Sequence, residues 1–331
     1  MKLIAYNVRD DEIPFVKAWG EKNNVEVSYS IDTLNAETVK QAQGYDGISG
    51  LQTIPYDEAL FSEMKEMGIS MLALRNVGLD NVDLTAAKKA GIVVTNVPAY
   101  SPASIAEFAV TLALAVNRKV GYMYHQLHEL GEFHFSPDFM GQLISNQTVG
   151  VVGTGRIGRE AIRMFTGLGA KVIAYSQSHL DDSDLNFTYV DSLEELLDQA
   201  DVIDLHIPGV PENEHLFDEK AFKHMKSSAI LINTARGSIV DTQALICALE
   251  EGEIAGAGID TLENESADLQ NSRSTAQVTD SNVLKLAKMP NVIVTPHSAF
   301  HTDEAVMNMV NISFNNLKQQ LTGGEVDNLA K

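Results

Sequence analysis

The sequence of 331 residues has little cysteine and no long apolar stretch, and each shortage narrows the class of protein. Its single cysteine, Cys247, excludes an internal disulfide framework. No apolar run approaches the roughly 20 residues needed to cross a bilayer. The first residues also lack the basic start, apolar run and small-residue cleavage site of a secretory signal. We therefore expect a protein of the reducing cytoplasm with no membrane association.

Basic residues are scarce as well. The chain has 24 Lys and Arg against 45 Asp and Glu, a formal net charge of −21. Such a charge disfavours binding to nucleic acid or to an anionic membrane, so neither is expected as a partner. An anionic substrate would have to be held by local cations against this field, which gives weight to any well-placed arginine. We predict no metal site.

Strand-like and helix-like patterns alternate along the chain. Apolar runs bounded by turn residues, several of them nearly continuous, predict strands buried on both faces of a parallel sheet. These runs are Lys2–Tyr6, Ser70–Leu74, Val149–Gly153, Lys171–Tyr175, Val202–His206, Ala229–Asn233 and Val292–Thr295. Helices are predicted between them at Ser104–Arg118, at Ser192–Gln199 with a capping box, and at Asp241–Glu251 before a stop at Gly252. This alternation is typical of a doubly wound α/β fold.

Two proline-containing breaks suggest where the chain divides, and a chain of this length is expected to form two domains. The breaks are Asn96–Pro102 and Thr295–His297. We predict one domain from residues 1–99 plus 300–331, whose tail is an amphipathic helix over about 303–323. Residues 100–299 would form the second domain. The polar stretch Glu263–Ser281 is expected to be an irregular surface excursion.

A glycine-rich turn follows the strand at Val149. It reads Gly153-Thr154-Gly155-Arg156-Ile157-Gly158 and leads into a helical pattern over Arg159–Gly167 and the strand Lys171–Tyr175. This is G-x-G-x-x-G in the strand–turn–helix context that dinucleotide binding requires. The glycines permit the tight turn, the approach of a pyrophosphate and close helix–strand packing. A plain tight turn between strand and helix is the alternative.

The residue at the end of the next strand is unusual for an NAD site. An Asp or Glu normally binds the ribose 2′-hydroxyl there, and this chain has Ser176. Without that carboxylate a 2′-phosphate would not be repelled, and Ser176, Ser178 and His179 could donate hydrogen bonds to it. We predict NAD(H) as cofactor with NADP(H) accepted alongside it. Ordinary NAD binding through Ser176 is the alternative.

Three later strand ends each carry a reactive residue. Arg236 lies in Asn233–Gly237, an acidic residue in Gly258–Glu265, and His297 in Thr295–Phe300. Ligands of open α/β sheets bind at the carboxyl ends of strands, so these residues could converge. Arginine offers a two-pronged donor to a carboxylate. Histidine can transfer a proton near neutral pH, and an adjacent carboxylate orients it and favours its charged form. Glu265 and Glu263 compete for that acidic role, and each residue alone could also be an ordinary turn or loop residue.

The chain resembles the D-isomer-specific 2-hydroxyacid dehydrogenases over essentially its whole length, and among them the D-lactate and D-hydroxyisocaproate dehydrogenases of lactic acid bacteria. The resemblance is carried by Arg75–Asp83, Asn96–Pro102, Thr148–Gly158, Asp204–Gly209, Asn233–Gly237 and Pro290–Phe300. It implies an NAD(P)H-dependent enzyme that reduces pyruvate or larger 2-oxo acids to D-2-hydroxy acids. It also implies two Rossmann- or flavodoxin-like domains separated by a cleft, and a homodimer built on the cofactor domain.

The resemblance also implies roles for individual residues. It makes Glu265 the acid beside His297, with Arg236 on the substrate carboxylate. The substrate would be lined by Leu51, Val77, Gly78, Tyr100 and Phe300. Besides the turn Gly153–Gly158 and Ser176, the cofactor would be lined by His206, Ile207, Pro208, Asn213, Thr234, Ala235, Arg236 and Asp260.

Leu51 bears on substrate specificity. Leu51 resembles the residue of the hydroxyisocaproate type, where Leu leaves room for a branched substrate, whereas lactate-type members tend to carry Tyr. Alternatively, Leu51 is only a core residue.

A non-enzymatic NAD(H)-binding regulator of the corepressor type is the alternative function. Formate dehydrogenases place Gln beside the His, which Glu265 disfavours. Phosphoglycerate dehydrogenase has extra regulatory domains for which this chain has no room.

Overall fold

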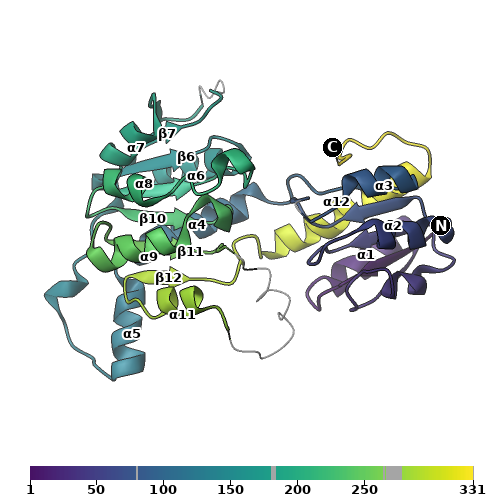
Figure 1. Cartoon of the computed structure of the whole chain (residues 1–331), viewed down its shortest axis with the longest axis horizontal. Helices are drawn as coiled ribbons and strands as arrows, with labels where there is room; N and C mark the ends of the chain where they lie inside the picture. The colour runs from purple at the N-terminus through teal and green to yellow at the C-terminus, as the bar shows by residue number, and fades with distance from the viewer. Residues whose placement is uncertain (80, 180–183, 264, 266–277, 331) are drawn as a thin grey trace. The chain divides into compact units, whose positions relative to one another are not determined.

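The computed structural model describes all residues except 80, 180–183, 264, 266–277 and 331. The chain divides into two compact units, and each is described by itself (Figure 1). Unit 1 comprises Met1–Ser101 and His301–Lys331, and unit 2 comprises Pro102–Phe300. Most of the predicted excursion Glu263–Ser281 lies outside the described residues.

Unit 1 is a parallel five-stranded sheet with helices on both faces. The strand order is β2-β1-β3-β4-β5. The strands are β1 (Lys2–Tyr6), β2 (Glu26–Tyr29), β3 (Gly47–Gly50), β4 (Met71–Leu74) and β5 (Val93–Thr95). The helices are α1 (Ile13–Asn23), the 3-10 turn η1 (Thr38–Ala42), α2 (Glu58–Glu66), α3 (Leu84–Ala90) and α12 (Asp303–Leu321).

Two apolar cores fill the faces of the unit 1 sheet. One face packs against α2 through Leu60, Phe61 and Met64, and against α3 through Ala86 and Ala87. The other packs against α1 and α12, where the Trp19 and Phe314 rings lie 5.1 Å apart. The C-terminal helix therefore covers the sheet formed by the N-terminal residues, as its amphipathic pattern predicts.

Unit 2 is a parallel seven-stranded sheet with strand order β12-β11-β10-β9-β6-β7-β8. The strands are β6 (Thr148–Val152), β7 (Lys171–Tyr175), β8 (Thr188–Tyr189), β9 (Val202–Leu205), β10 (Ile230–Asn233), β11 (Gly256–Ile259) and β12 (Val292–Val294). The α-helices are α4 (Pro102–Asn117), α5 (Val120–Leu130), α6 (Arg156–Gly167), α7 (Leu193–Gln199), α8 (Glu219–His224), α9 (Thr242–Glu251) and α11 (Ser281–Ala287). The 3-10 turns are η2 (Pro137–Phe139), η3 (Ile144–Asn146), η4 (Pro211–Asn213) and η5 (Gly237–Ile239).

The order of the unit 2 strands locates a ligand site. The chain runs outward from β6 to β7 and β8, then returns to β9 on the other side of β6. Such a switch point leaves a crevice at the carboxyl ends of the strands, where ligands of open α/β sheets bind. The cores on the two faces involve α4 and α6 on one side and α7, α8 and α9 on the other. The predicted doubly wound α/β fold is confirmed in both units.

Predicted helix ends agree with the observed caps. Ser192 accepts a hydrogen bond from the Glu195 backbone N–H at the start of α7. Asp241 caps α9, and Gly252 ends that helix in a left-handed conformation at φ 71°. Helix α6 begins at Arg156, three residues before the pattern predicted, because the turn glycines lead straight into it.

Helix α5 and the chain after it contribute little to the core. None of the α5 residues is buried. Apolar side chains continue on the surface beyond it, with Phe133, Phe135 and Met140 between 80% and 91% exposed. Figure 1 shows α5 extending from the β12 edge of the unit 2 sheet. Across the described residues, no helix is both long and apolar enough to cross a membrane.

Candidate functional site

The glycine-rich turn joins β6 to α6, and its three glycines meet different constraints. Gly153 has φ +98°, and a Cβ there would lie 2.6 Å from the His206 carbonyl oxygen. A Cβ at Gly158 would lie 2.0 Å from the Gly153 carbonyl oxygen. At Gly155 nothing lies within 4 Å of the Cβ position, so this face of the turn is open beside the start of α6. Free backbone N–H groups at a helix start favour an anion in that space.

The tip of β7 carries the residues expected at the ribose end. Ser176 is half-buried, and Gln177, Ser178 and His179 are exposed. The His179 ring stacks on Tyr189 with centroids 3.9 Å apart. The Tyr189 hydroxyl is 3.0 Å from the Thr154 hydroxyl in the glycine-rich turn, to which it donates. The β7 tip is thereby tied to the phosphate-binding turn.

His206, Ile207 and Pro208 follow β9. The His206 Nε2 lies 2.8 Å from Asp204 Oδ2, and both side chains are buried. His206 Nδ1 is buried and has no partner within the described residues. Asn213 donates to the Pro208 carbonyl at 2.9 Å, so it braces this loop.

The tip of β10 holds Arg236. Asn233 accepts from the Ala235 N–H and donates to the Arg236 carbonyl, both at 3.0 Å, which fixes the turn. The guanidinium of Arg236 donates to the Ala235 carbonyl at 2.8 Å. A Cβ on Gly209 would lie 2.9 Å from Arg236 Cγ, so the arginine stem packs against Gly209. Gly209 ends the Asp204–Gly209 motif, but a glycine has no side-chain chemistry from which this contact could be predicted.

Asp260 organises the loop that carries His297. It is buried, and its carboxylate accepts from the Thr295 hydroxyl at 2.5 Å and from the N–H groups of Ser298 and Ala299 at 2.9 Å. The His297 backbone N–H donates to the Asp260 carbonyl at 2.9 Å. His297 has φ 51°, a left-handed conformation that such bonds help to hold.

The two candidate acids occupy different places. Glu265 Oε1 lies 2.6 Å from His297 Nδ1, and its Oε2 accepts from the Leu262 N–H at 2.9 Å. Glu263 instead lies 2.6 Å from His215 Nε2 and accepts from the Thr242 N–H at 2.9 Å. The structure therefore brings Glu265 and His297 together and directs Glu263 elsewhere. The Glu265 and His297 side chains are 25% and 30% exposed, so a ligand can reach them.

Phe300, which follows this loop, is the last residue of unit 2 and is half-buried.

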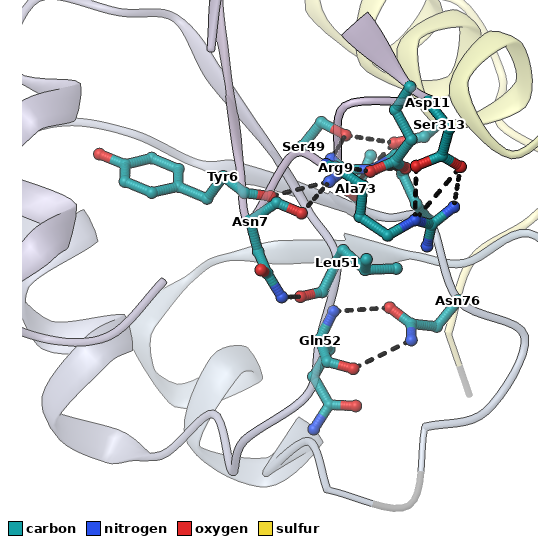
Figure 2. A network of polar contacts seen from close by, with 12 residues as sticks. Tyr6, Asn7, Arg9, Asp11, Ser49, Leu51, Gln52, Ala73, Asn76 and Ser313 are labelled. Atoms are coloured by element: carbon teal, nitrogen blue, oxygen red, sulfur yellow. Dashed lines mark hydrogen bonds and ion pairs between the residues drawn. The ribbon is translucent and has the colours of Figure 1, made fainter. Parts of the chain in front are cut away.

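Unit 1 contains the other predicted substrate residues. Leu51 follows β3, is buried, and accepts from the Asn7 amide at 3.1 Å through its carbonyl. Asn76 exchanges two hydrogen bonds with the Gln52 backbone, at 2.7 and 3.0 Å (Figure 2). Val77 is 36% exposed and precedes Gly78. The loops after β3 and β4 are thus bonded to each other.

Arg75 supports these loops, a role that its place in the motif Arg75–Asp83 does not reveal. Its guanidinium is fully buried and pairs with buried Glu12 at 2.8 Å. It also donates to the Ser49 hydroxyl at 3.0 Å and to the Tyr6 carbonyl at 2.8 Å. Ser49 in turn bonds to Ser313 of α12 at 2.9 Å (Figure 2).

A second charged group in unit 1 consists of Arg9, Asp11 and His301. Arg9 pairs with Asp11 at 3.0 Å, and His301 lies 2.9 Å from the same carboxylate. Burial alone would raise the pKa of Asp11, but the bonds from Arg9 and His301 outweigh it and hold the pKa at about 2. The backbone carbonyl of Tyr100 accepts from Asn308 of α12 at 2.7 Å.

The residues of unit 2 fit a dinucleotide. The open face at Gly155 suits a pyrophosphate. The buried Thr234 hydroxyl and His206 Nδ1 lack partners within the described residues, and such groups ordinarily meet a ligand or water. Among those residues, no group of three or more His, Cys, Asp or Glu could hold a metal ion.

Comparisons with known proteins agree with this geometry. Residues 110–299 match the family model described as D-isomer specific 2-hydroxyacid dehydrogenase, NAD binding domain. The chain is 47% identical over 325 residues to a D-2-hydroxyacid dehydrogenase (NAD+) of Lacticaseibacillus paracasei, covering 98% of this chain and 97% of that protein. It is 46% identical over 317 residues to a D-lactate/D-glycerate dehydrogenase of Pediococcus acidilactici, covering 96% and 95%.

Solved structures give the same result over both units. A D-2-hydroxyisocaproate dehydrogenase has TM-score 0.93 and 47% identity, covering 100% of this chain and 99% of that one. A D-isomer specific 2-hydroxyacid dehydrogenase from Lactobacillus delbrueckii ssp. bulgaricus, in its NAD complexed form, has TM-score 0.89 and 38% identity, with full coverage of both chains.

Proposed function

The chain belongs to the D-isomer-specific 2-hydroxyacid dehydrogenases, a family of NAD-dependent oxidoreductases, and on that premise we propose that Arg236, Glu265 and His297 carry its reaction. The reaction is the reduction of a small 2-oxo acid to the D-2-hydroxy acid. When bound, the reduced nicotinamide cofactor supplies the hydride. Residues 1–99 with 300–331 are proposed as the substrate domain, and residues 100–299 as the dinucleotide-binding domain.

The observation that carries this proposal is the 2.6 Å contact between Glu265 and His297 Nδ1. A carboxylate at that distance fixes the orientation of the ring. The other ring nitrogen, Nε2, is then available to give a proton to the substrate carbonyl oxygen. Arg236 binds the substrate carboxylate through the planar fork that only guanidinium offers. Among the described residues its guanidinium donates to the Ala235 carbonyl, which leaves other N–H groups for that task.

The cofactor would be held by Gly153–Gly158, Ser176, His206, Ile207, Pro208, Asn213, Thr234, Ala235, Arg236 and Asp260. Its diphosphate would use the open N–H groups at Gly155, and Thr234 would offer its buried hydroxyl. The substrate would contact Leu51, Val77, Gly78, Tyr100 and Phe300, with the N–H groups of Val77 and Gly78 donating to its carboxylate. The relatives are dehydrogenases, which favours this function over the nucleotide-sensing regulator.

Single-site variants test the proposal. His297→Ala and Arg236→Ala should lower kcat by roughly 100-fold or more while leaving the Kd for NADH within a few fold, because neither removes the phosphate-binding turn. Turnover is followed by NADH absorbance with pyruvate and 2-oxoisocaproate, and Kd by fluorescence titration. The matched control is His224→Ala, which alters an exposed pair with Asp198 at 3.3 Å. Wild-type turnover in His297→Ala would overturn the assignment.

The substrate range is proposed to extend beyond pyruvate to larger 2-oxo acids such as 2-oxoisocaproate. Leu51 is buried and directly follows β3, where the resemblance places one side of the substrate pocket. A Leu side chain leaves more space there than a Tyr side chain. Each buried methylene contributes up to about 0.8 kcal/mol. Leu51→Tyr should shift the ratio of kcat/KM towards pyruvate. An unchanged ratio would show that Leu51 is only a core residue.

The cofactor preference is proposed to be relaxed, with NADPH used alongside NADH. Ser176 places no carboxylate at the β7 tip, and Ser178 and His179 are exposed beside it. Ser176→Asp should restore repulsion of a 2′-phosphate and lower kcat/KM for NADPH selectively. A hundredfold preference of the wild-type enzyme for NADH would refute this.

A homodimer built on unit 2, working in the cytoplasm, completes the proposal. Helix α5 has no buried residue, and Phe133, Phe135 and Met140 beyond it are exposed. Exposed apolar side chains of this kind are typical of surfaces that an interface covers. Phe133→Ser with Phe135→Ser should shift sedimentation from dimer to monomer. A wild-type monomer at micromolar concentration would end the idea.

A further inference from the structure

Three backbone segments of unit 2 meet beside the proposed catalytic pair. His215 donates through its backbone N–H to the Ser238 carbonyl at 2.8 Å, and Phe217 donates to the Ile239 carbonyl at 3.0 Å. The segment after β9 is therefore bonded to the segment after β10. A third segment, after β11, packs against the second, because a Cβ on Gly237 would lie 2.0 Å from the Leu262 carbonyl carbon.

Glu263 ties the third segment to the other two. One carboxylate oxygen lies 2.6 Å from His215 Nε2, and the other accepts from the Thr242 N–H at 2.9 Å. Both oxygens are thus engaged, one by a side chain after β9 and one by the start of α9. Burial alone would raise the pKa of Glu263, but the bonds from Thr242 and His215 outweigh it and lower the pKa.

Glu265 is attached to the same piece of backbone. Its Oε2 accepts from the Leu262 N–H at 2.9 Å, and its Oε1 contacts His297. The place of Glu265 therefore depends on where Leu262 and Glu263 lie. Nothing in these contacts requires Glu263 to touch substrate or cofactor.

His215 occupies its position against a backbone preference. Its φ is 50°, in the left-handed region that non-glycine residues seldom adopt. Asp241 lies 3.8 Å from its Nδ1, and Glu214 is the other acidic neighbour that acts on it. The hydrogen bond that His215 donates to Glu263, aided by these carboxylates, raises the pKa of His215. The chain thus keeps a histidine in a strained place where its ring meets Glu263.

We propose that Glu263, held by His215, is a positioning residue that fixes the Leu262–Glu263 backbone and so aligns Glu265 with His297. This inference rests on the proposed function of Glu265 and His297. The coupling runs from His215 through Glu263 and the adjoining backbone to Glu265. Arg236 directly precedes Gly237, which packs against Leu262, so the position of Arg236 also depends on the Leu262–Glu263 backbone.

Misalignment of Glu265 has a signature that general loss of structure lacks. In 2-oxo acid reduction the required imidazolium is lost as pH rises, so kcat/KM falls along a basic limb. A less well-placed carboxylate favours imidazolium less, and the limb moves to lower pH. A smaller folded fraction lowers kcat/KM without moving the basic limb toward acid, because the stability that His215 adds is largest at acid pH.

The test compares Glu263→Ala, Glu263→Gln, His215→Ala and His215→Gln in the full-length enzyme. Glu263→Ala should lower kcat on the order of 10- to 100-fold, with a smaller change in the KM for the oxo acid. Its basic limb should move toward acid. His215→Ala should give a milder change in the same direction, and His215→Gln, which restores a donor, should recover part of it. The control His224→Ala should match the wild type.

A double variant separates positioning from an independent role. If Glu263 acts through Glu265, adding Glu263→Gln to Glu265→Gln should move the limb no further than Glu265→Gln alone. A fully additive shift, or a loss of kcat in Glu263→Ala with an unmoved limb, would overturn the proposal while leaving the proposed function intact. Unaltered turnover in Glu265→Gln and His297→Ala would instead refute the proposed function itself.

Discussion

Removing the carboxylate of Glu12 should destabilise unit 1 strongly. Glu12 and Arg75 are both fully buried and lie 2.8 Å apart. In Glu12→Gln the guanidinium keeps its bonds to Ser49 and to two backbone carbonyls but loses its counter-charge. Breaking a buried pair in this way costs about 3–5 kcal/mol. Whole domains are stable by only about 5–15 kcal/mol, so the effect should be large.

The assay is urea unfolding followed by the fluorescence of the single tryptophan, Trp19. Trp19 is buried on Phe314 in unit 1, so its emission reports the unfolding of that unit. Arg75→Met should cost a similar amount, because it leaves Glu12 buried and unpaired. The double variant should cost about as much as one single variant, since no unpaired charge remains.

Lys89→Met is the matched control. Lys89 pairs with Glu58 in the same unit, but the two side chains are 74% and 64% exposed, so the unfolding midpoint should not move. Single variants that each cost less than about 1 kcal/mol, or a double variant equal to their sum, would refute the reasoning.

Three further predictions concern unit 2. Gly158→Ala would place a methyl 2.0 Å from the Gly153 carbonyl oxygen, so the melting temperature should fall by an amount equivalent to about 1–3 kcal/mol and fluorescence titration should show weaker NADH binding. Asp260→Asn removes the charge that binds two backbone N–H groups in the loop of His297. Steady-state assays should show kcat lowered by about tenfold or more. An unchanged kcat would show that other contacts hold the loop. The pKa of His215 is raised in the folded chain, so the stability that its ring adds is present at acid pH and is lost as pH rises through the folded pKa. The difference in unfolding midpoint between wild type and His215→Gln, followed by circular dichroism, should accordingly shrink as the pH rises above the ordinary histidine pKa of about 6.5. A difference that stays constant with pH would contradict the contact with Glu263.

Much of the fold could be predicted because its signals are local. Buried parallel strands give apolar runs, and the caps of α7 and α9 are short motifs, so both appear in the sequence itself. The phosphate-binding turn was predictable for the same reason, because its G-x-G-x-x-G pattern is a short motif. The limit on Gly158 is local, from the Gly153 carbonyl, whereas the limit on Gly153 comes from His206 and nothing crowds Gly155.

The pairing of the two acids could not be predicted from the residues alone. Glu263 and Glu265 are two positions apart on an irregular segment, where no helical or strand period assigns directions. The choice depends on His215, 48 residues before Glu263, and on His297, 32 residues after Glu265. The buried Arg75 was equally hidden, because arginine is seldom buried and its partner Glu12 lies 63 residues away.

On the proposed function, residue 51 would set which substrates the scaffold accepts. Its main chain is held by Asn7 and by the Tyr6 carbonyl, whereas the leucine side chain contributes no hydrogen bond to that support. A different side chain at position 51 can therefore keep these main-chain hydrogen bonds and leave the strands of unit 1 unchanged. On the proposed function, a change of a single codon would be enough to retune which acids the enzyme accepts, while folding and the proton-transfer machinery are inherited unchanged.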